Sequence, residues 1–127
     1  WLVKDGKEYI FDLKTVQVNA GNGNSFSQKV MEWYAYRLLA NPSVDIKIAM
    51  AFPYSPHRPF TVDSWWRVEG KKAYPLVRGD DALVQEDFWD ILGGQSGTWK
   101  RILTTFENLR NSDFADKYHE LFYPDDL

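Results

Sequence analysis

The sequence predicts an α/β or α+β domain in which a mixed sheet is flanked by helices, and three observations support this class. Asp5-Gly6 lies between two short apolar runs, the pattern of a β-hairpin. Residues 44–52 place large apolar side chains on one face of a strand and two alanines on the other, as in a central strand covered on both faces. Most of the remaining chain has helical patterns.

The turn at Asp5-Gly6 fixes the register of the hairpin. A type I′ turn needs positive φ at both central residues, and Asp-Gly meets that need. With this turn Leu2 faces Tyr9, and the residue opposite Asp12 lies just before Trp1.

The other elements follow from caps and breakers. Asn24 or Ser25 is expected to cap a helix that runs to about Ala40. The proline-rich segment 53–59 must be an extended or turning loop. The later elements are a short strand at 65–68, a turn at 70–72, and helices at about 81–92, 98–109 and 112–122.

The bulk composition describes one globular domain over residues 1–127. Of the 127 residues, 44% are hydrophobic and 26% charged, which excludes a disordered chain. There is no cysteine and no apolar run of membrane-spanning length, so we expect a cytoplasmic protein with no membrane partner. The chain opens at Trp1 inside a strand-like run, so we interpret it as a C-terminal fragment of a longer chain that lacks the N-terminal part of the core.

Asp12 and Lys14 are the most informative residues. A strand repeats every two residues, so both point to the same face, while apolar side chains point to the other. A carboxylate beside an ammonium suits a metal ligand next to a cation that orients a water or a phosphate. An edge-strand ion pair is the structural alternative.

The order hairpin, Asp-x-Lys, helix and buried strand resembles the core of the PD-(D/E)XK nucleases, a restriction-endonuclease-like fold. Longer blocks resemble type II restriction endonucleases that cut GGNCC-like sites. These blocks are YIFDLKT at 9–15 followed by NAGN at 19–22, IAMAFPYSP at 48–56, and EDFWDILGG at 86–94.

The resemblance implies that Asp12 is the second metal-binding carboxylate and Lys14 the catalytic lysine. The carbonyl of Leu13 is expected to reach the same Mg²⁺ ion. The first acidic ligand is not visible, so an upstream segment or a second chain is expected to supply it. Asp5 is too far along the hairpin to replace it.

For other polar residues, a role in DNA binding and a purely structural role both remain open. Gln28 and Glu32 either line the site or are exposed polar groups of a helix. The net charge of −3 disfavours a nucleic-acid partner unless one face is locally basic. The residues expected to contact DNA are Asn19, Asn22, Tyr54, His57, Arg58, Lys71 and Lys72, with Arg67 and Arg78 adding to a basic face.

The predicted function is that of a Mg²⁺-dependent type II restriction endonuclease. As a homodimer it would hydrolyse both strands of a short palindromic site in double-stranded DNA. Two alternatives remain open: a structure-specific repair or recombination nuclease, and a non-catalytic DNA- or protein-binding module.

Overall fold

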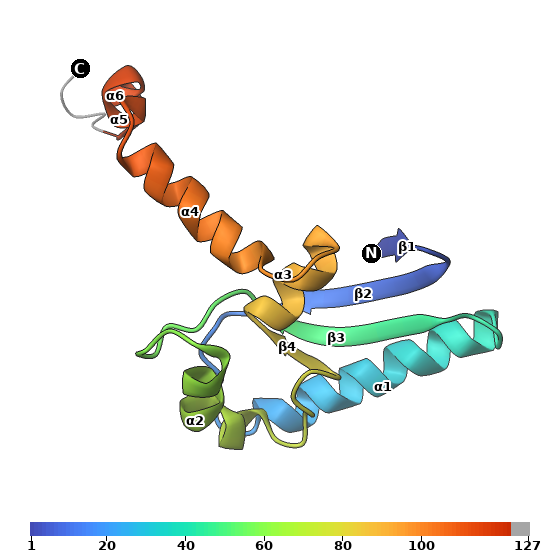
Figure 1. The fold of residues 1–127 in the computed structure, drawn as a ribbon. Coiled ribbons are helices and arrows are strands. Elements are labelled where there is room, and N and C mark those ends of the chain that lie inside the picture. The colour runs from blue at the N-terminus through green and yellow to red at the C-terminus, as the bar shows by residue number, and fades with distance from the viewer. Residues whose placement is uncertain (123–127) are drawn as a thin grey trace.

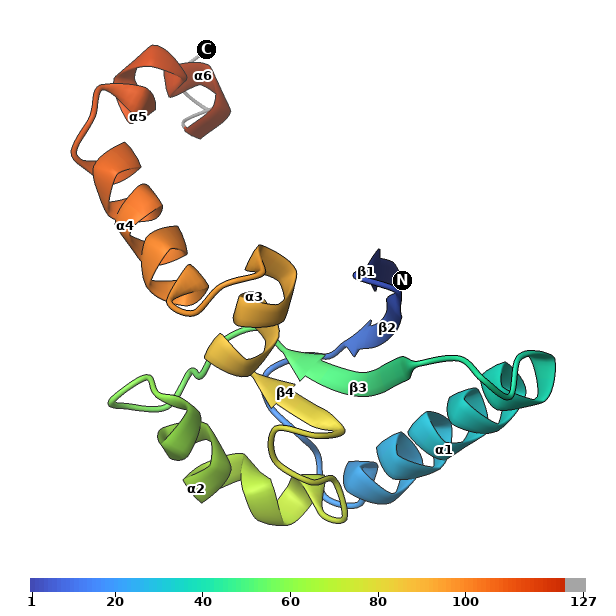
Figure 2. The ribbon, with the colours of Figure 1, turned by 45° about the vertical axis from the view of Figure 1, so that its right-hand side comes forward.

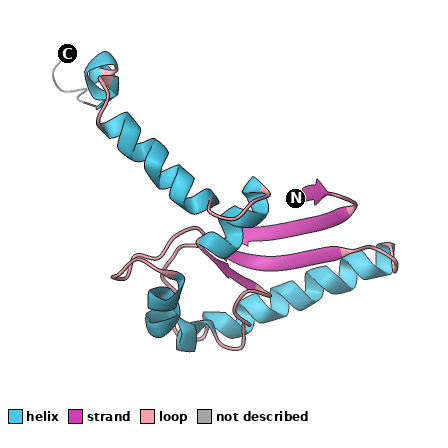
Figure 3. Ribbon diagram, viewed as in Figure 1, coloured by secondary structure: helices cyan, strands magenta, loops and turns pink. Residues whose placement is uncertain are grey.

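The computed structural model describes residues 1–122, and it contains a four-stranded mixed sheet with helices on both faces (Figure 1, Figure 3). The strands lie in the order β1-β2-β3-β4; β1 is antiparallel to β2, and the other neighbours are parallel. The α/β class and the mixed sheet are therefore confirmed. The elements are β1 (Leu2–Lys4), β2 (Lys7–Leu13), α1 (Asn22–Ala40), β3 (Ile46–Phe52), α2 (Val62–Ala73), β4 (Ala82–Val84), α3 (Glu86–Gly93), α4 (Thr98–Arg110), α5 (Phe114–Lys117) and α6 (His119–Phe122).

The β1-β2 hairpin has the predicted turn and register. Asp5 and Gly6 both have positive φ, 50° and 77°, as a type I′ turn requires. Leu2 pairs with Tyr9.

Strand β3 divides its side chains between two cores, as its alternation predicted. Ile48, Met50 and Phe52 pack into the core on the side of α1 and α2. Ala49 and Ala51 face α3, where their small side chains leave room for the ring of Phe88. Figure 1 shows α1 and α2 on one face of the sheet and α3 on the other.

The predicted strand at 65–68 is wrong, because these residues lie in α2, as does the predicted turn at 70–72. Thr61 and Ser64 form a reciprocal capping box that starts the helix. The ring of Trp65 is then fully buried in the core. Helical capping and burial outweigh the β-propensity of the tryptophans.

The predicted helix at 81–92 is wrong in its first half. Residues Ala82–Val84 form β4, which is buried and pairs in parallel with β3. Gln85 has a φ of 50°, and the backbone turns there between β4 and α3, which begins at Glu86. A pairing partner about thirty positions earlier, invisible in local sequence, decided this segment.

Three further helix assignments differ from the prediction. Helix α1 begins at Asn22 after Gly21, whose φ is 86°, so neither Asn24 nor Ser25 is its cap. The segment 112–122 contains the two short helices α5 and α6 rather than one. Helix α4 ends one residue after the predicted boundary, and the α4–α6 segment projects away from the sheet in both views (Figures 1 and 2).

The three parallel strands end at one edge of the sheet. In sheets of this kind, ligands bind outside the carboxyl ends of the strands. Strand β2 reaches this edge at Leu13, β3 at Phe52 and β4 at Val84. Within residues 1–122, every helix is too short or too polar to cross a membrane.

Candidate functional site at the carboxyl edge of the sheet

Asp12 and Lys14 lie together where β2 ends. The ammonium of Lys14 is 2.7 Å from Oδ2 of Asp12, and both side chains are about four-fifths buried. The backbone N–H of Lys14 donates to the carbonyl of Ala51, which ties this residue to β3 just beyond the named strand. The period-two spacing thus brings a carboxylate and an ammonium to one side of the sheet edge.

A second lysine, which the sequence analysis did not single out, reaches the same carboxylate. Lys29, on α1, places its Nζ 3.2 Å from Oδ2 of Asp12. Burial by itself would raise the pKa of Asp12, but hydrogen bonds from Lys14 and Lys29, together with their positive charges, lower it overall. The only signal in the sequence is that Lys29 interrupts an apolar stripe of the helix, one turn from Phe26 and Trp33.

An open pocket of about 430 Å³ adjoins Lys14. Asn19 and Tyr54, both predicted to contact DNA, line it together with the backbone segment that follows β2. The pocket separates the loop after β2 from the loop after β3. Its position beside the Asp12–Lys14 pair makes it the concave part of the candidate site.

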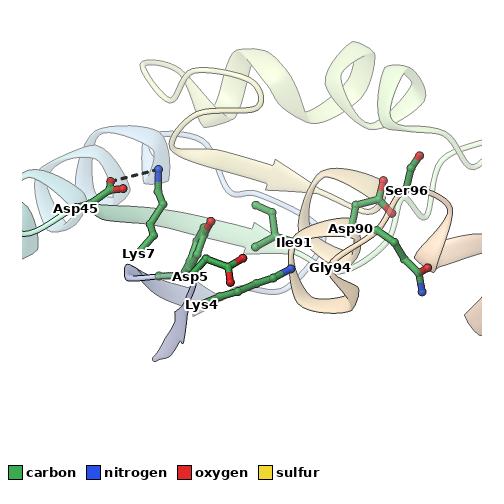
Figure 4. Close-up of a pocket in the computed structure, with 10 residues that line it drawn as sticks. Lys4, Asp5, Lys7, Asp45, Asp90, Ile91, Gly94 and Ser96 are labelled. Atoms are coloured by element: carbon green, nitrogen blue, oxygen red, sulfur yellow. Dashed lines mark ion pairs between the residues drawn. The ribbon is translucent and has the colours of Figure 1, made fainter.

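A larger pocket of about 610 Å³ lies elsewhere, at the turn of the hairpin (Figure 4). Its lining mixes cations and carboxylates, including Lys4, Lys7 and Asp45, and the last two form an exposed ion pair of 3.4 Å. Lys7 precedes Asp12 by five residues on the same strand, a distance of about 16 Å. Size therefore does not identify the site in this molecule, and the smaller pocket is the better candidate.

Helix α2 holds the loop that follows Lys14. The indole N–H of Trp65 donates to the carbonyl of Val16 at 2.7 Å. The backbone N–H of Val18 donates to Oε2 of Glu69 at 2.9 Å. Both anchors are buried, so one wall of the 430 Å³ pocket is fixed by the interior of the protein.

Glu69 also holds two residues that were predicted to contact DNA. Its carboxylate accepts from Nε2 of His57 at 2.8 Å and pairs with Nζ of Lys72 at 2.5 Å. Burial would raise the pKa of Glu69, but the hydrogen bonds from Lys72, Val18 and His57 lower it overall. The structure thus places His57 and Lys72 around a buried carboxylate rather than beside Asp12.

The proline-rich loop after β3 is fastened from the other side by Gln85. This buried amide accepts from the N–H of Ser55 at 2.8 Å and donates to the carbonyl of Phe60 at 3.0 Å. The indole of Trp89 donates to the carbonyl of Pro53. Sequence reasoning missed Gln85, because the two contacts that fasten the loop are with residues 25 to 30 positions away.

The remaining predicted residues lie around this edge or on the helices. The guanidinium of Arg58 stacks over the ring of Phe60, 5.2 Å from its centroid. Gln28 and Glu32 are exposed on α1 and bond to each other at 2.8 Å.

Acidic partners neutralise part of the expected basic face, since Arg78 pairs with Asp63 and Lys72 with Glu69. Asn22 starts α1, and Lys71 is exposed on α2. Arg67 donates to the carbonyl of Arg58.

Metal ligands within residues 1–122 are sparse. No three His, Cys, Asp or Glu side chains of that range come together as a group that could hold an ion. Asp12 contributes an ionised carboxylate at the sheet edge. It is a suitable oxygen ligand for a hard cation, and it would be one ligand among several.

Comparison with known proteins gives two matches. A family model described as the type II restriction endonuclease HinfI matches residues 2–110. The type II restriction enzyme MjaII of Methanocaldococcus jannaschii is 28% identical over 120 residues, which cover 88% of this chain and 32% of that enzyme. The chain therefore spans about a third of the length of this curated relative. No solved structure matches significantly.

Proposed function

Because the chain belongs to the HinfI family of type II restriction endonucleases, we propose that it is the catalytic-core part of an enzyme that cuts DNA. The enzyme would hydrolyse both strands of double-stranded DNA at a short palindromic site. One observation carries the assignment: Asp12 and Lys14 meet at 2.7 Å on the carboxyl edge of β2, beside an open pocket. The core would have the arrangement of the PD-(D/E)XK nucleases. The enzyme would act in the cytoplasm.

Lys14 supplies the positive charge that this chemistry needs. In the attack of water on a phosphodiester, negative charge builds up on the phosphoryl oxygens. An ammonium held at a fixed point stabilises that charge without reorganising. Lys14 is fixed by its backbone bond to β3 and by the ring of Phe26, whose centroid is 5.1 Å from Nζ.

Asp12 and the carbonyl of Leu13 are the groups that we propose as ligands of Mg²⁺. Both offer oxygen, the ligand atom that Mg²⁺ prefers, and the lowered pKa keeps the carboxylate of Asp12 ionised. A bound Mg²⁺ ion would act as a Lewis acid and would lower the pKa of a coordinated water. A further acidic ligand is needed, and we propose that an upstream segment or a second chain provides it.

The DNA would lie across the carboxyl edge of the sheet. The two loops that border the pocket expose Asn19, Tyr54 and Arg58, of which arginine is the usual reader of guanine. Lys71, Lys72, Asn22 and His57 are weaker candidates, the last two because they are partly covered by the protein itself. A homodimer would match the two-fold symmetry of a palindrome, and a GGNCC-like site is the first to test.

The test is cleavage of plasmid DNA by the full-length gene product with Mg²⁺ or with EDTA. We expect discrete fragments with Mg²⁺ and none with EDTA. Asp12→Asn and Lys14→Gln should each slow cleavage by about 100-fold or more, as for other groups that stabilise a transition state. Lys100→Gln, a change of one exposed charge on α4, is the matched control.

Three results would overturn the proposal, each in a different way. Cleavage of branched DNA without cleavage of intact duplex would favour a structure-specific nuclease. Tight binding of DNA without cleavage, unchanged in Asp12→Asn, would favour a binding module. Wild-type rates in both Asp12→Asn and Lys14→Gln would remove these residues from the mechanism.

A further inference from the structure

Two lysines converge on a single carboxylate oxygen at the candidate site. Nζ of Lys14 is 2.7 Å and Nζ of Lys29 is 3.2 Å from Oδ2 of Asp12. Two positive charges against one negative charge leave an excess of one positive charge. The chemistry assigned above uses only Lys14, so Lys29 has no function in it.

The position of Lys29 suits a group that meets a ligand. Its side chain is 41% exposed, against 22% for Lys14, so Lys29 is the more accessible of the two cations at the Asp12 carboxylate. Its Nζ lies 5.8 Å from the centroid of the Trp33 ring, a cation–π contact that restricts where the ammonium can point. Its backbone belongs to a nineteen-residue helix that packs on the sheet, so the ammonium is presented from a rigid element.

The nearest further acid does not cancel this charge by direct contact. Glu32 lies one turn along α1 and attracts Lys29 electrostatically. Its Oε1, however, accepts from the amide of Gln28 at 2.8 Å, and no ion pair between Glu32 and Lys29 is formed. Glu32 is exposed to water, where an attraction between charged side chains contributes little.

We propose that Lys29 is a second phosphate-binding lysine, which pairs with Asp12 in the free protein and moves to a phosphodiester oxygen of bound DNA. The role rests on the proposed function, because it assumes that DNA enters at this edge. Asp12 then has two cationic partners in the free protein. Both ammoniums become available to phosphate when the carboxylate binds Mg²⁺, as proposed above. An ammonium acts as a point charge for phosphate, which fits the single contact that Lys29 can offer.

The experiment measures DNA binding rather than cleavage. The full-length protein carries Asp12→Asn, which removes the competing negative charge while keeping the shape of the side chain. Affinity for a labelled duplex containing a GGNCC site is measured by fluorescence anisotropy between about 50 and about 200 mM KCl. Lys29→Gln, Lys29→Arg and the control Lys100→Gln are each added to this background.

Loss of one phosphate contact should reduce the slope of log K against log salt by about 0.9. Lys29→Gln should therefore show a shallower slope and about 8-fold weaker binding at about 0.1 M salt. Lys29→Arg should restore both, and Lys100→Gln should change neither. With Asp12 intact, Lys29→Gln should have a smaller effect, because the lysine is then shared with the carboxylate.

Equal slopes for Lys29→Gln and Lys100→Gln would overturn the inference while leaving the nuclease assignment intact. If neither the wild-type protein nor the Asp12→Asn variant bound duplex DNA, the proposed function itself would fail. Lys29→Arg distinguishes a folding defect from the loss of charge. It keeps the charge, so weaker binding in this variant as well would mean that the lysine side chain is needed for packing.

Discussion

Replacement of Glu69 tests whether helix α2 fixes both loops of the candidate site. Its carboxylate holds three donors: the N–H of Val18 at 2.9 Å, Nε2 of His57 at 2.8 Å and Nζ of Lys72 at 2.5 Å. Val18 belongs to the loop after β2, and His57 to the loop after β3. In Glu69→Ala all three donors lose their acceptor.

The size of the effect follows from how well water can replace the carboxylate. A hydrogen bond to a charged group contributes about 1.5–3 kcal/mol. The side chains of His57 and Lys72 are 21% and 36% exposed, so water recovers part of their loss. Val18 is buried, so its N–H is left without a partner. We therefore expect Glu69→Ala to lower the free energy of unfolding by about 3 kcal/mol, near the lower end for breaking a buried pair.

The assay is urea denaturation followed by tryptophan fluorescence. Glu69→Gln keeps an oxygen for Val18 but loses the charge, so about half of the destabilisation should remain. The control is Glu107→Ala on α4, whose ion pair with Arg110 is exposed and long at 3.8 Å, with an expected change within about 0.5 kcal/mol. A Glu69→Ala variant as stable as this control would refute the reasoning, and the loops would have to be held by other contacts.

Three further predictions concern the same framework. Gly23→Ala should lower Tm by about 5–10 °C in a calorimetric scan, because a Cβ there would collide with the backbone carbonyl of Tyr74; an unchanged Tm would mean that α1 and α2 can move apart. Trp65→Phe removes the hydrogen bond to the carbonyl of Val16 and should lower the free energy of unfolding by about 1–2 kcal/mol in urea titrations, whereas equal stability would show that this bond contributes nothing. Folding lowers the pKa of Glu69. The stabilisation from its ionised carboxylate is therefore complete above the unfolded-state pKa and is lost as pH falls through the folded-state pKa. Between about pH 7 and pH 3 the free energy of unfolding of wild type should fall more steeply than that of Glu69→Gln, and parallel curves would contradict this prediction.

The local sequence was enough to predict features that depend on neighbouring residues. The Asp5-Gly6 pair predicted the hairpin turn and its register, and both residues have the positive φ that this turn requires. The two-residue period of a strand put Asp12 and Lys14 on one side, where the structure has them 2.7 Å apart. Each of these features is set by backbone geometry within a few residues, so long-range packing did not need to be known.

The identity of two segments was decided by partners far along the chain. Ala82–Val84 became a strand because β3 offered it a buried, parallel edge. Residues 65–68 became helical because the helix that Thr61 caps buries Trp65 beneath the sheet. Local propensity is weak beside such burial, so it misjudged both segments.

The sequence by itself determined which residues could carry the chemistry, because residue type and strand period are local properties. Only the tertiary structure decided what surrounds them. Lys29 reaches Asp12 because α1 packs against the sheet, and Glu69 and Gln85 reach the two loops across 12 to 51 positions of chain. Contacts over such separations depend on how distant elements pack, and each must offset the entropy of closing a loop, so local patterns do not reveal them.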